Sequence, residues 1–323
     1  MNMVHQRLPT ETLDNVLRLI PETDKATLKI CTLLSRTLCG IAQPHLFYRI
    51  SLNIGDETRD IASFIRFLKE NPRFSFYVRK LLVGFVTGDS APLEGQRFLT
   101  AEKLGSVLEC LRRVHSLDLR FVTIRAIGKS IDSYLRKFTR VDLSRLSIDC
   151  TRDSDDEGLV EILALFGEVD DLVTDGLPVP DEIRWAGIQA LLPEGESRKQ
   201  SPTDYSYIKA LKLRLSTTQL RLTAFPSQFD NGGSGTFLRI LQNTSVVHNM
   251  TSLSLSISTR EQLNSLAQFL KSGCPSLSFC TLDIQLAYYN SQRRVALEPF
   301  ELAFLSPCHG LMDLTIKTSV LTN

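Results

Sequence analysis

A short apolar pattern that returns along most of the chain constrains the fold more than any other feature. An apolar residue is followed by two residues, a second apolar residue, one residue and a third apolar residue, which is typical of a strand with one buried face. The pattern occurs at Val78/Leu81/Val83, Val114/Leu117/Leu119, Phe138/Val141/Leu143, Ile208/Leu211/Leu213, Met250/Leu253/Leu255, Phe279/Leu282/Ile284 and Leu311/Leu314/Ile316, with Val169/Leu172 as a weaker member. The middle positions are 24 to 42 residues apart. Spacings of this length indicate a repeat array.

Helical stripes lie between these strands. Apolar residues at i, i+3, i+4 and i+7 occur at Ile61/Phe64/Ile65/Leu68, Leu104/Val107/Leu108/Leu111, Leu159/Ile162/Leu163/Phe166 and Leu263/Leu266/Ala267/Leu270, with a shorter stripe at Phe237/Ile240/Leu241. Units of one strand and one helix bury their apolar faces only by stacking on their neighbours. Two polar or glycine-rich segments, 178–207 and 223–236, are predicted to be loops.

A doubly wound α/β sheet is the alternative, because it also alternates strands with helices. Its strands are buried on both faces and are therefore nearly continuous apolar runs. Here polar residues alternate with the apolar ones, as Asp118 does between Leu117 and Leu119. One face of the sheet is therefore expected to contact water, which favours the array.

Composition narrows the functional class. The chain has 323 residues, more than one ordinary core comfortably serves, and its 37 basic and 36 acidic residues argue against bulk electrostatic binding to nucleic acid or an anionic membrane. No apolar run approaches the roughly 18 residues of a membrane span, and the N-terminus lacks the apolar region of a secretory signal. The seven cysteines include no CxxC pair and are expected to be reduced. We therefore expect a cytoplasmic or nuclear protein.

The N-terminal residues form a separate helical module. Three short helices are predicted within residues 8–50, with a first stripe at Leu13, Val16, Leu17 and Ile20, a second at Ile30, Leu33 and Leu34, and a third at Leu38, Ile41 and Ala42. Pro21 ends the first helix, Thr23 or Asp24 caps the second, and Pro44 is expected to end the third. The predicted domains are therefore a module over residues 1–52 and an array over residues 53–323.

This module resembles the F-box. The resemblance rests on Leu8-Pro9-Thr10-Glu11 with the apolar helix that follows, on Asp24 at the start of the second helix, and on the step Leu34-Ser35-Arg36. The segment from Pro44 to Ile50 is similar to the end of many fungal F-box-like sequences, and Leu38 stands where the family commonly has Trp. The resemblance covers about 45 residues of the chain.

The repeats resemble leucine-rich repeats, and their uneven spacing predicts an irregular array. The fold class expected is therefore α/β, a short three-helix F-box-like module followed by an irregular leucine-rich-repeat-like solenoid. In proteins of this kind the F-box docks on the Skp adaptor of a cullin-based (SCF-type) ubiquitin ligase, while the repeats hold a protein substrate. The adaptor-binding residues that the resemblance implies are Leu8, Pro9, Glu11, Leu13, Val16, Leu17, Leu34 and Ile50.

A substrate-binding face is predicted from the residues between the apolar anchors. They point to the wet face of the sheet, and the charged ones are Asp118, Arg120, Arg140, Asp142, Lys212, Arg214, Asp283 and Lys317, beside serines at 252, 254 and 256. Their mixed charge favours a protein or peptide partner over a phosphate backbone. A merely solvated face is the alternative.

No motif indicates catalysis, a metal or a cofactor. Gly128-Lys129-Ser130 lacks the earlier glycine of a phosphate-binding loop, where Thr123 stands, and the five histidines share no metal-ligand spacing. We therefore expect a non-enzymatic protein without cofactor or metal, and no nucleic-acid or membrane partner. Two alternatives remain open: a repeat scaffold with the N-terminal helices as its cap, and an enzyme whose site forms only in the fold.

Overall fold

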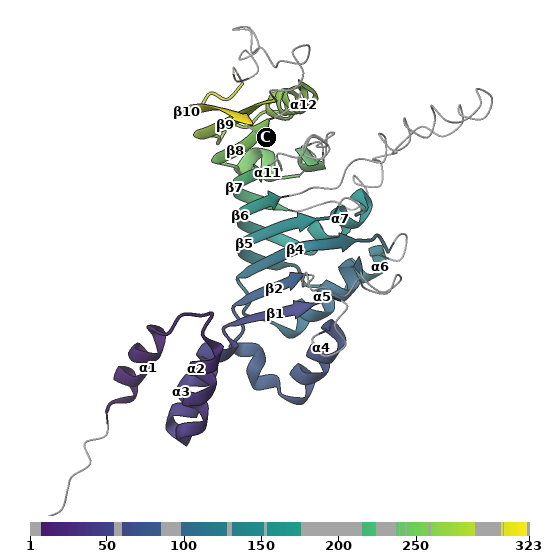
Figure 1. Cartoon of the computed structure of the whole chain (residues 1–323). Coiled ribbons are helices and arrows are strands. Elements are labelled where there is room, and N and C mark those ends of the chain that lie inside the picture. Colours follow the sequence, from purple (N-terminus) through teal and green to yellow (C-terminus); the bar gives the residue numbers. More distant parts are fainter. Residues whose placement is uncertain are drawn as a thin grey trace, which may run out of the picture.

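The computed structural model of the chain contains an open, parallel sheet of ten strands with a small helical module at one end (Figure 1). The residues that it describes are 8–54, 60–84, 98–127, 131–151, 154–175, 215–223, 237–238, 240–242, 244–257, 260–287, 305 and 307–321. The mixed α/β class predicted from the sequence is confirmed at this level.

Three helices form the N-terminal module, as the apolar stripes predicted. They are α1 (Thr10–Arg18), α2 (Lys25–Leu34) and α3 (Arg36–Phe47). The side chain of Asp24 caps α2 by accepting from the Thr27 N–H at 3.0 Å, and Ser35 caps α3 by accepting from the Leu38 N–H at 3.1 Å.

The prediction that Pro44 ends the third helix is wrong, since α3 continues to Phe47. Proline inside a helix removes the hydrogen bond from its own nitrogen to the carbonyl four residues earlier, here that of Gly40. Gly40 lies at an exposed position, where water can satisfy that carbonyl. Only one turn follows Pro44, so the helix loses little by continuing through it.

The sheet follows the order of the chain. The strands are β1 (Arg49–Asn53), β2 (Lys80–Gly84), β3 (Phe98–Leu99), β4 (Ser116–Ile124), β5 (Val141–Cys150), β6 (Phe166–Asp175), β7 (Ser216–Thr223), β8 (Ser252–Ile257), β9 (Phe279–Ala287) and β10 (Asp313–Leu321). Each pairs in parallel with the next, apart from β3, which pairs only with β4. The order never reverses, whereas reversal defines a doubly wound sheet.

The connecting helices cover one face of the sheet. They are α4 (Ile61–Glu70), the 3₁₀ helix η1 (Pro72–Phe76), α5 (Ala101–Cys110), α6 (Ile131–Leu135), α7 (Asp156–Leu163), α11 (Val246–Asn249) and α12 (Arg260–Lys271). Figure 1 shows α4, α5, α6, α7 and α12 on the same side of the strands. This arrangement follows when every parallel crossover has the same hand and every strand is added at the same edge.

Two rows of side chains beneath these helices form the core. The strand register aligns Ile50, Leu81, Leu117, Leu146, Leu172, Leu220, Leu253, Cys280 and Leu314 in the first row, and Leu52, Val83, Leu119, Ile148, Thr174, Leu222, Leu255, Leu282 and Ile316 in the second. From β2 to β9 every member is at most 2% exposed. Burial of each large aliphatic side chain stabilises the sheet by about 1.5–3 kcal/mol.

Two predicted anchors are displaced along their strands. Leu146, rather than Val141, aligns with Leu117, because β5 carries the apolar pattern twice and its second copy, ending at Ile148, faces the neighbouring strand. In β9 the residue that aligns with Leu253 is Cys280, two positions before the predicted anchor. A pattern that matches at two nearby registers does not by itself select one of them.

The strand predicted at 208–213 is not the one that joins β6 to β8. Its residues lie outside the described part of the chain, and β7, at Ser216–Thr223, pairs with both neighbours. In β7 the first place of the pattern holds Thr217, which is fully buried and donates its hydroxyl to the Gln219 carbonyl at 2.9 Å. A hydrogen-bonded threonine therefore occupies an apolar position, and the pattern search missed it.

Candidate functional site

The sheet face opposite the helices, here called the open face, carries mostly polar side chains. The register places Arg49, Lys80, Ser116, Arg145, Asp171, Gln219, Ser252, Phe279 and Asp313 side by side along one row of this face. Positively charged residues occupy the beginning of the row, and Asp171 follows them on β6. The charge along this row therefore changes from positive to negative between β5 and β6.

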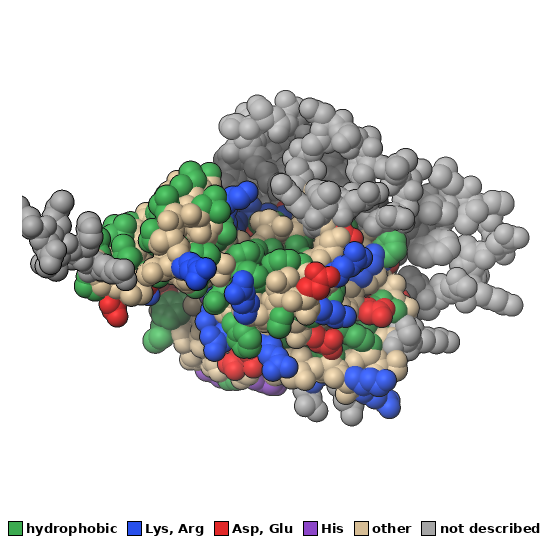
Figure 2. Space-filling model, turned by 90° about the horizontal axis from the view of Figure 1, so that it is seen from below, with side chains coloured by type: hydrophobic (Ala, Val, Ile, Leu, Met, Phe, Trp, Pro, Cys, Tyr) green, Lys and Arg blue, Asp and Glu red, His purple; other side chains and the backbone are tan. Residues whose placement is uncertain are grey.

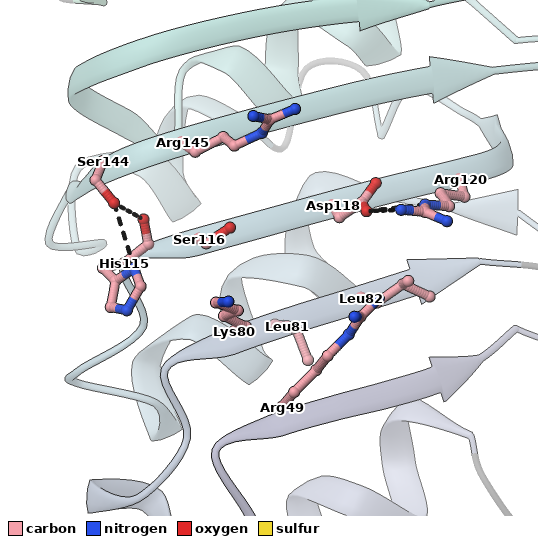
Figure 3. Close-up of a pocket in the computed structure, with 10 residues that line it drawn as sticks. All are labelled: Arg49, Lys80, Leu81, Leu82, His115, Ser116, Asp118, Arg120, Ser144 and Arg145. Carbon is pink, nitrogen blue, oxygen red and sulfur yellow. Dashed lines mark hydrogen bonds and ion pairs between the residues drawn. The ribbon is translucent and has the colours of Figure 1, made fainter. Parts of the chain in front are cut away.

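A cleft of about 410 Å³ lies at the positive end of the open face. We call it the cationic cleft, and its lining is Arg49, Lys80, Leu81, Leu82, His115, Ser116, Asp118, Arg120, Ser144 and Arg145, from β1, β2, β4, β5 and the residues before them. Figure 3 shows Arg49 reaching across β2 toward Leu82 and Arg145 lying along its own strand. Seen from below, Lys and Arg side chains are spread over the described surface, with acidic side chains among them (Figure 2).

Cations outnumber carboxylates in this cleft. Asp118 is the single acidic residue of the lining, and Arg120 neutralises it through Nε and Nη2, at 2.8 and 2.6 Å from Oδ2. This hydrogen bond and the charge of Asp118 raise the pKa of Arg120 above its ordinary value. Arg49, Lys80 and Arg145 remain as cationic groups that the lining itself does not neutralise.

The backbone at the start of β5 is fixed beside the cleft. Ser144 donates its hydroxyl to the His115 carbonyl at 2.8 Å, and its oxygen lies 3.3 Å from His115 Nδ1 (Figure 3). The backbone N–H groups of Ser144 and Arg145 also donate to that carbonyl. The strand is therefore held firmly at the position from which the Arg145 side chain extends.

The predicted substrate residues separate into four pairs. Asp118 and Arg120 line the cationic cleft, and Asp283 and Lys317 lie opposite each other on β9 and β10. Arg140 and Asp142 lie at the start of β5, where they hydrogen-bond backbone: Arg140 Nε donates to the Ala164 carbonyl at 3.3 Å, and Asp142 accepts from the Glu168 N–H at 2.8 Å. Lys212 and Arg214 lie outside the described residues.

Sequence reasoning missed Arg49, Lys80 and Arg145. Arg49 belongs to β1, the first strand of the sheet, which begins four residues before the array boundary that the sequence predicts. Arg145 follows from the apolar pattern once the register through Leu146 is used. Lys80 directly precedes the anchor Leu81 and so lies between two apolar anchors, which is the same criterion that selected the predicted substrate-binding residues.

The helical module exposes an apolar surface. Leu17, Leu28 and Ala42 are buried within the module, at 5%, 1% and 0% exposure. Six large aliphatic side chains remain more than half exposed, and we call them the apolar surface of the module: Leu8, Val16, Leu19, Ile30, Leu33 and Leu34. Such a concentration within 27 residues is typical of a surface that binds another protein.

The predicted adaptor residues divide between this surface and the interior. Leu8, Pro9, Glu11, Val16 and Leu34 are exposed, and Leu13 is half-buried. Leu17 is buried, and Ile50 lies on β1, packed against the core of the sheet. Leu17 therefore belongs to the interior of the module and Ile50 to the core of the sheet, and neither is part of the apolar surface. The first helix alone did not reveal Leu19, which lies outside its main apolar stripe.

The module is attached to the sheet by aromatic and polar contacts. Phe47 at the end of α3 lies 4.3 Å from Phe74 and 6.2 Å from Phe67, measured between ring centroids. The Tyr48 carbonyl accepts from the N–H groups of Arg79 and Lys80. A groove of about 530 Å³ remains between the two parts, lined by residues of both. This end of the array is therefore covered by α4 and η1 together with Phe47, the last residue of the module's third helix.

An ion-pair cluster joins α1 to α3. Asp14 Oδ1 lies 2.7 Å from His45 Nε2, and Asp14 Oδ2 lies 2.8 Å from Arg18 Nη2. The hydrogen bond to His45 and, less strongly, the charges of Arg18 and His45 hold the pKa of Asp14 below its usual range. The cluster orients the helix that carries Val16.

The described residues also bear on metal binding and membrane insertion. They contain no group of three or more His, Cys, Asp or Glu residues that could hold a metal ion. Their longest helices, α3 and α12, have 12 residues each, and none is both long and apolar enough to cross a membrane.

Comparison with known proteins adds no family assignment. No protein-family model matches the chain, and no curated protein matches its sequence. The function therefore has to be argued from the two surfaces described above.

Proposed function

We propose that this chain is the substrate-recognition subunit of a cullin-based (SCF-type) ubiquitin ligase. In this proposal the helical module is F-box-like and docks on an Skp-type adaptor, and through it on a cullin. The sheet and its helices form an irregular leucine-rich-repeat-like array that holds a protein substrate on the open face. The chain supplies binding and proximity, and other subunits carry out ubiquitin transfer.

The observation that carries the proposal is the exposure of the apolar surface of the module. A cap would turn its apolar side chains toward the array, whereas Leu8, Leu19 and Leu33 are 63%, 82% and 78% exposed. Of the module's large side chains, Phe47 packs on the core of the array beside α4 and η1, while these three leucines do not. The module thus retains a surface for a further protein, and the F-box resemblance names the kind of partner.

The array part of the proposal rests on the strand order. Every successive strand is added at the same edge, the described crossover helices lie over one face, and two rows of mainly aliphatic anchors repeat from strand to strand. A leucine-rich-repeat array has these three properties. None of the described helices covers the opposite face, which is then available to a partner.

The alternative is a scaffold for protein–protein interaction that uses no ubiquitin-ligase adaptor. It shares the open face and differs only in what the module binds. Capture of an Skp-type adaptor therefore separates the two functions.

The test uses the full chain, a purified Skp-type adaptor and the substitution Val16→Asp. Val16 is 53% exposed, so the charge should leave the fold intact while placing an unpaired carboxylate in the interface. We expect adaptor affinity to fall at least roughly 100-fold, which corresponds to about 2.8 kcal/mol. Ala62→Asp, on the exposed side of α4, is the matched control and should bind like wild type. Failure of the wild-type chain to bind any Skp-type adaptor would leave the scaffold as the function.

A further inference from the structure

We propose that the cationic cleft binds an acidic segment of a partner protein, through the carboxylates of Asp or Glu side chains on that segment. The proposal deepens the proposed function and rests on it for one point, the role of the array as the part that holds the substrate. It adds the place on the open face where the substrate binds and the chemistry by which it is recognised.

The first argument is local charge. The whole chain has a formal net charge of +1, whereas the cleft lining has four Lys or Arg side chains and one carboxylate. That carboxylate, on Asp118, is already bound by Arg120. Positive charge concentrated in a hollow on an otherwise balanced surface attracts an anionic group and fixes where it binds.

The second argument is that two arginines have unused capacity for hydrogen bonding. Among the described residues, no carboxylate lies within ion-pair distance of Arg49. Arg145 Nη1 reaches Asp171 Oδ2 only at 3.4 Å, because Arg221 binds both oxygens of Asp171, at 3.1 and 2.6 Å. A guanidinium group binds carboxylates through paired N–H donors, so Arg49 and Arg145 can each accept a carboxylate from a ligand.

The third argument comes from a carboxylate of the chain itself. Glu22, in the turn between α1 and α2, reaches the edge of the cleft and binds Lys80 Nζ through Oε1 at 3.0 Å and Oε2 at 3.3 Å. The Lys80 ammonium group also lies 5.3 Å from the centre of the Tyr48 ring. Glu22 therefore shows how a glutamate side chain is held here, and it competes with any ligand for Lys80.

The dimensions of the cleft fit a short peptide. The four adjacent strands β1, β2, β4 and β5 carry the positive part, which is therefore roughly 14 Å wide, and about four residues of an extended chain span it. Beyond it the row continues with Asp171, which is ion-paired with Arg221 and Arg145. The lining has no Phe, Tyr or Trp on which bases could stack.

The experiment measures binding of a short fluorescent glutamate-rich peptide to the full chain in low-salt buffer, with the glutamine version of the same peptide as the ligand control. We expect the glutamine peptide to bind at least tenfold more weakly. The double substitution Arg49→Glu with Arg145→Glu should weaken binding of the glutamate peptide at least tenfold, and the milder pair Arg49→Gln with Arg145→Gln should weaken it to a smaller degree. Glu22→Gln should strengthen it about two- to threefold, because Lys80 loses its competing carboxylate. Arg66→Glu, on the exposed side of α4, reverses the charge of one arginine outside the cleft and should leave affinity unchanged.

Several results would overturn the proposal. They are equal binding of the glutamine peptide, an equal loss with Arg66→Glu, and no loss in either double variant that still melts like wild type. If the peptide binds only when its glutamates are changed to phosphoserines, the ligand of the cleft is a phosphate group and not a carboxylate. Tighter binding of a single-stranded oligonucleotide would indicate a nucleic-acid site instead. Adaptor capture by the same protein sample is measured separately, so loss of peptide binding with intact adaptor capture counts against the cleft alone.

Discussion

Leu146 and Leu33 offer a direct comparison of one substitution at two kinds of position. Leu146 is fully buried on β5 between Leu117 and Leu172, whereas Leu33 is 78% exposed on α2. Leu146→Ala leaves a cavity in the row of anchors, and such substitutions cost about 2–5 kcal/mol. Leu33→Ala removes few contacts within the chain and should change stability by about 0.5 kcal/mol or less.

The assay is thermal and urea unfolding of both variants beside wild type. In a domain of this size about 1 kcal/mol shifts Tm by roughly 2–4 °C, so Leu146→Ala should lower Tm by roughly 5–15 °C. Val141→Ala, at the half-buried start of the same strand, should have a smaller effect. Equal destabilisation by Leu146→Ala and Leu33→Ala would refute both the register of β5 and the exposure of the module surface. A larger effect of Val141→Ala than of Leu146→Ala would refute the register alone.

Three further predictions concern the contacts around these surfaces. Phe47→Ala removes the Phe47–Phe74 contact and should destabilise the junction between module and sheet by about 3 kcal/mol. Residues 8–47 should then be more sensitive to limited proteolysis. Unchanged cleavage would contradict the role of Phe47 in attaching the module. Because the pKa of Asp14 is lowered in the folded protein, its contribution to stability is complete above the ordinary carboxyl pKa and is lost as pH falls through the lowered value. Asp14→Asn should therefore destabilise the module at neutral pH and have no effect once Asp14 is protonated. An equal effect at both pH values would show that charge is not the cause. Burial raises the pKa of Cys274 and Cys280 to about 12, so both thiols should resist alkylation in the native protein at mildly alkaline pH. Half-buried Cys31 should react under the same conditions, and peptide mass spectrometry measures the labelling of each cysteine. Rapid labelling of Cys280 would contradict its burial.

Much of the architecture could be predicted because apolar spacing records which side of each element is buried. The three module helices, α4, α5, α12 and most of the strands follow from it. The spacing failed where two matches overlap, as at Leu143, which ends one match on β5 and begins the next. It also failed at Thr217, where an internal hydrogen bond makes a polar side chain compatible with the core.

The candidate sites were less predictable than the fold. Exposure of the module surface depends on which apolar side chains the three short helices bury among themselves, and Leu17 and Leu19 are only two positions apart in the sequence with opposite outcomes. The cationic cleft brings together residues from Arg49 to Arg145, and their alignment depends on the strand register. Local sequence therefore predicted the type of surface, while the members of each surface required the fold.

The function is tested most directly by amide hydrogen exchange of the full chain with and without an Skp-type adaptor. We expect slower exchange on adaptor binding within residues 8–34, which contain the apolar surface of the module, and little change in β1 to β10. No binding by any Skp-type adaptor, or protection confined to the open face with residues 8–34 unchanged, would contradict the proposed ubiquitin-ligase function.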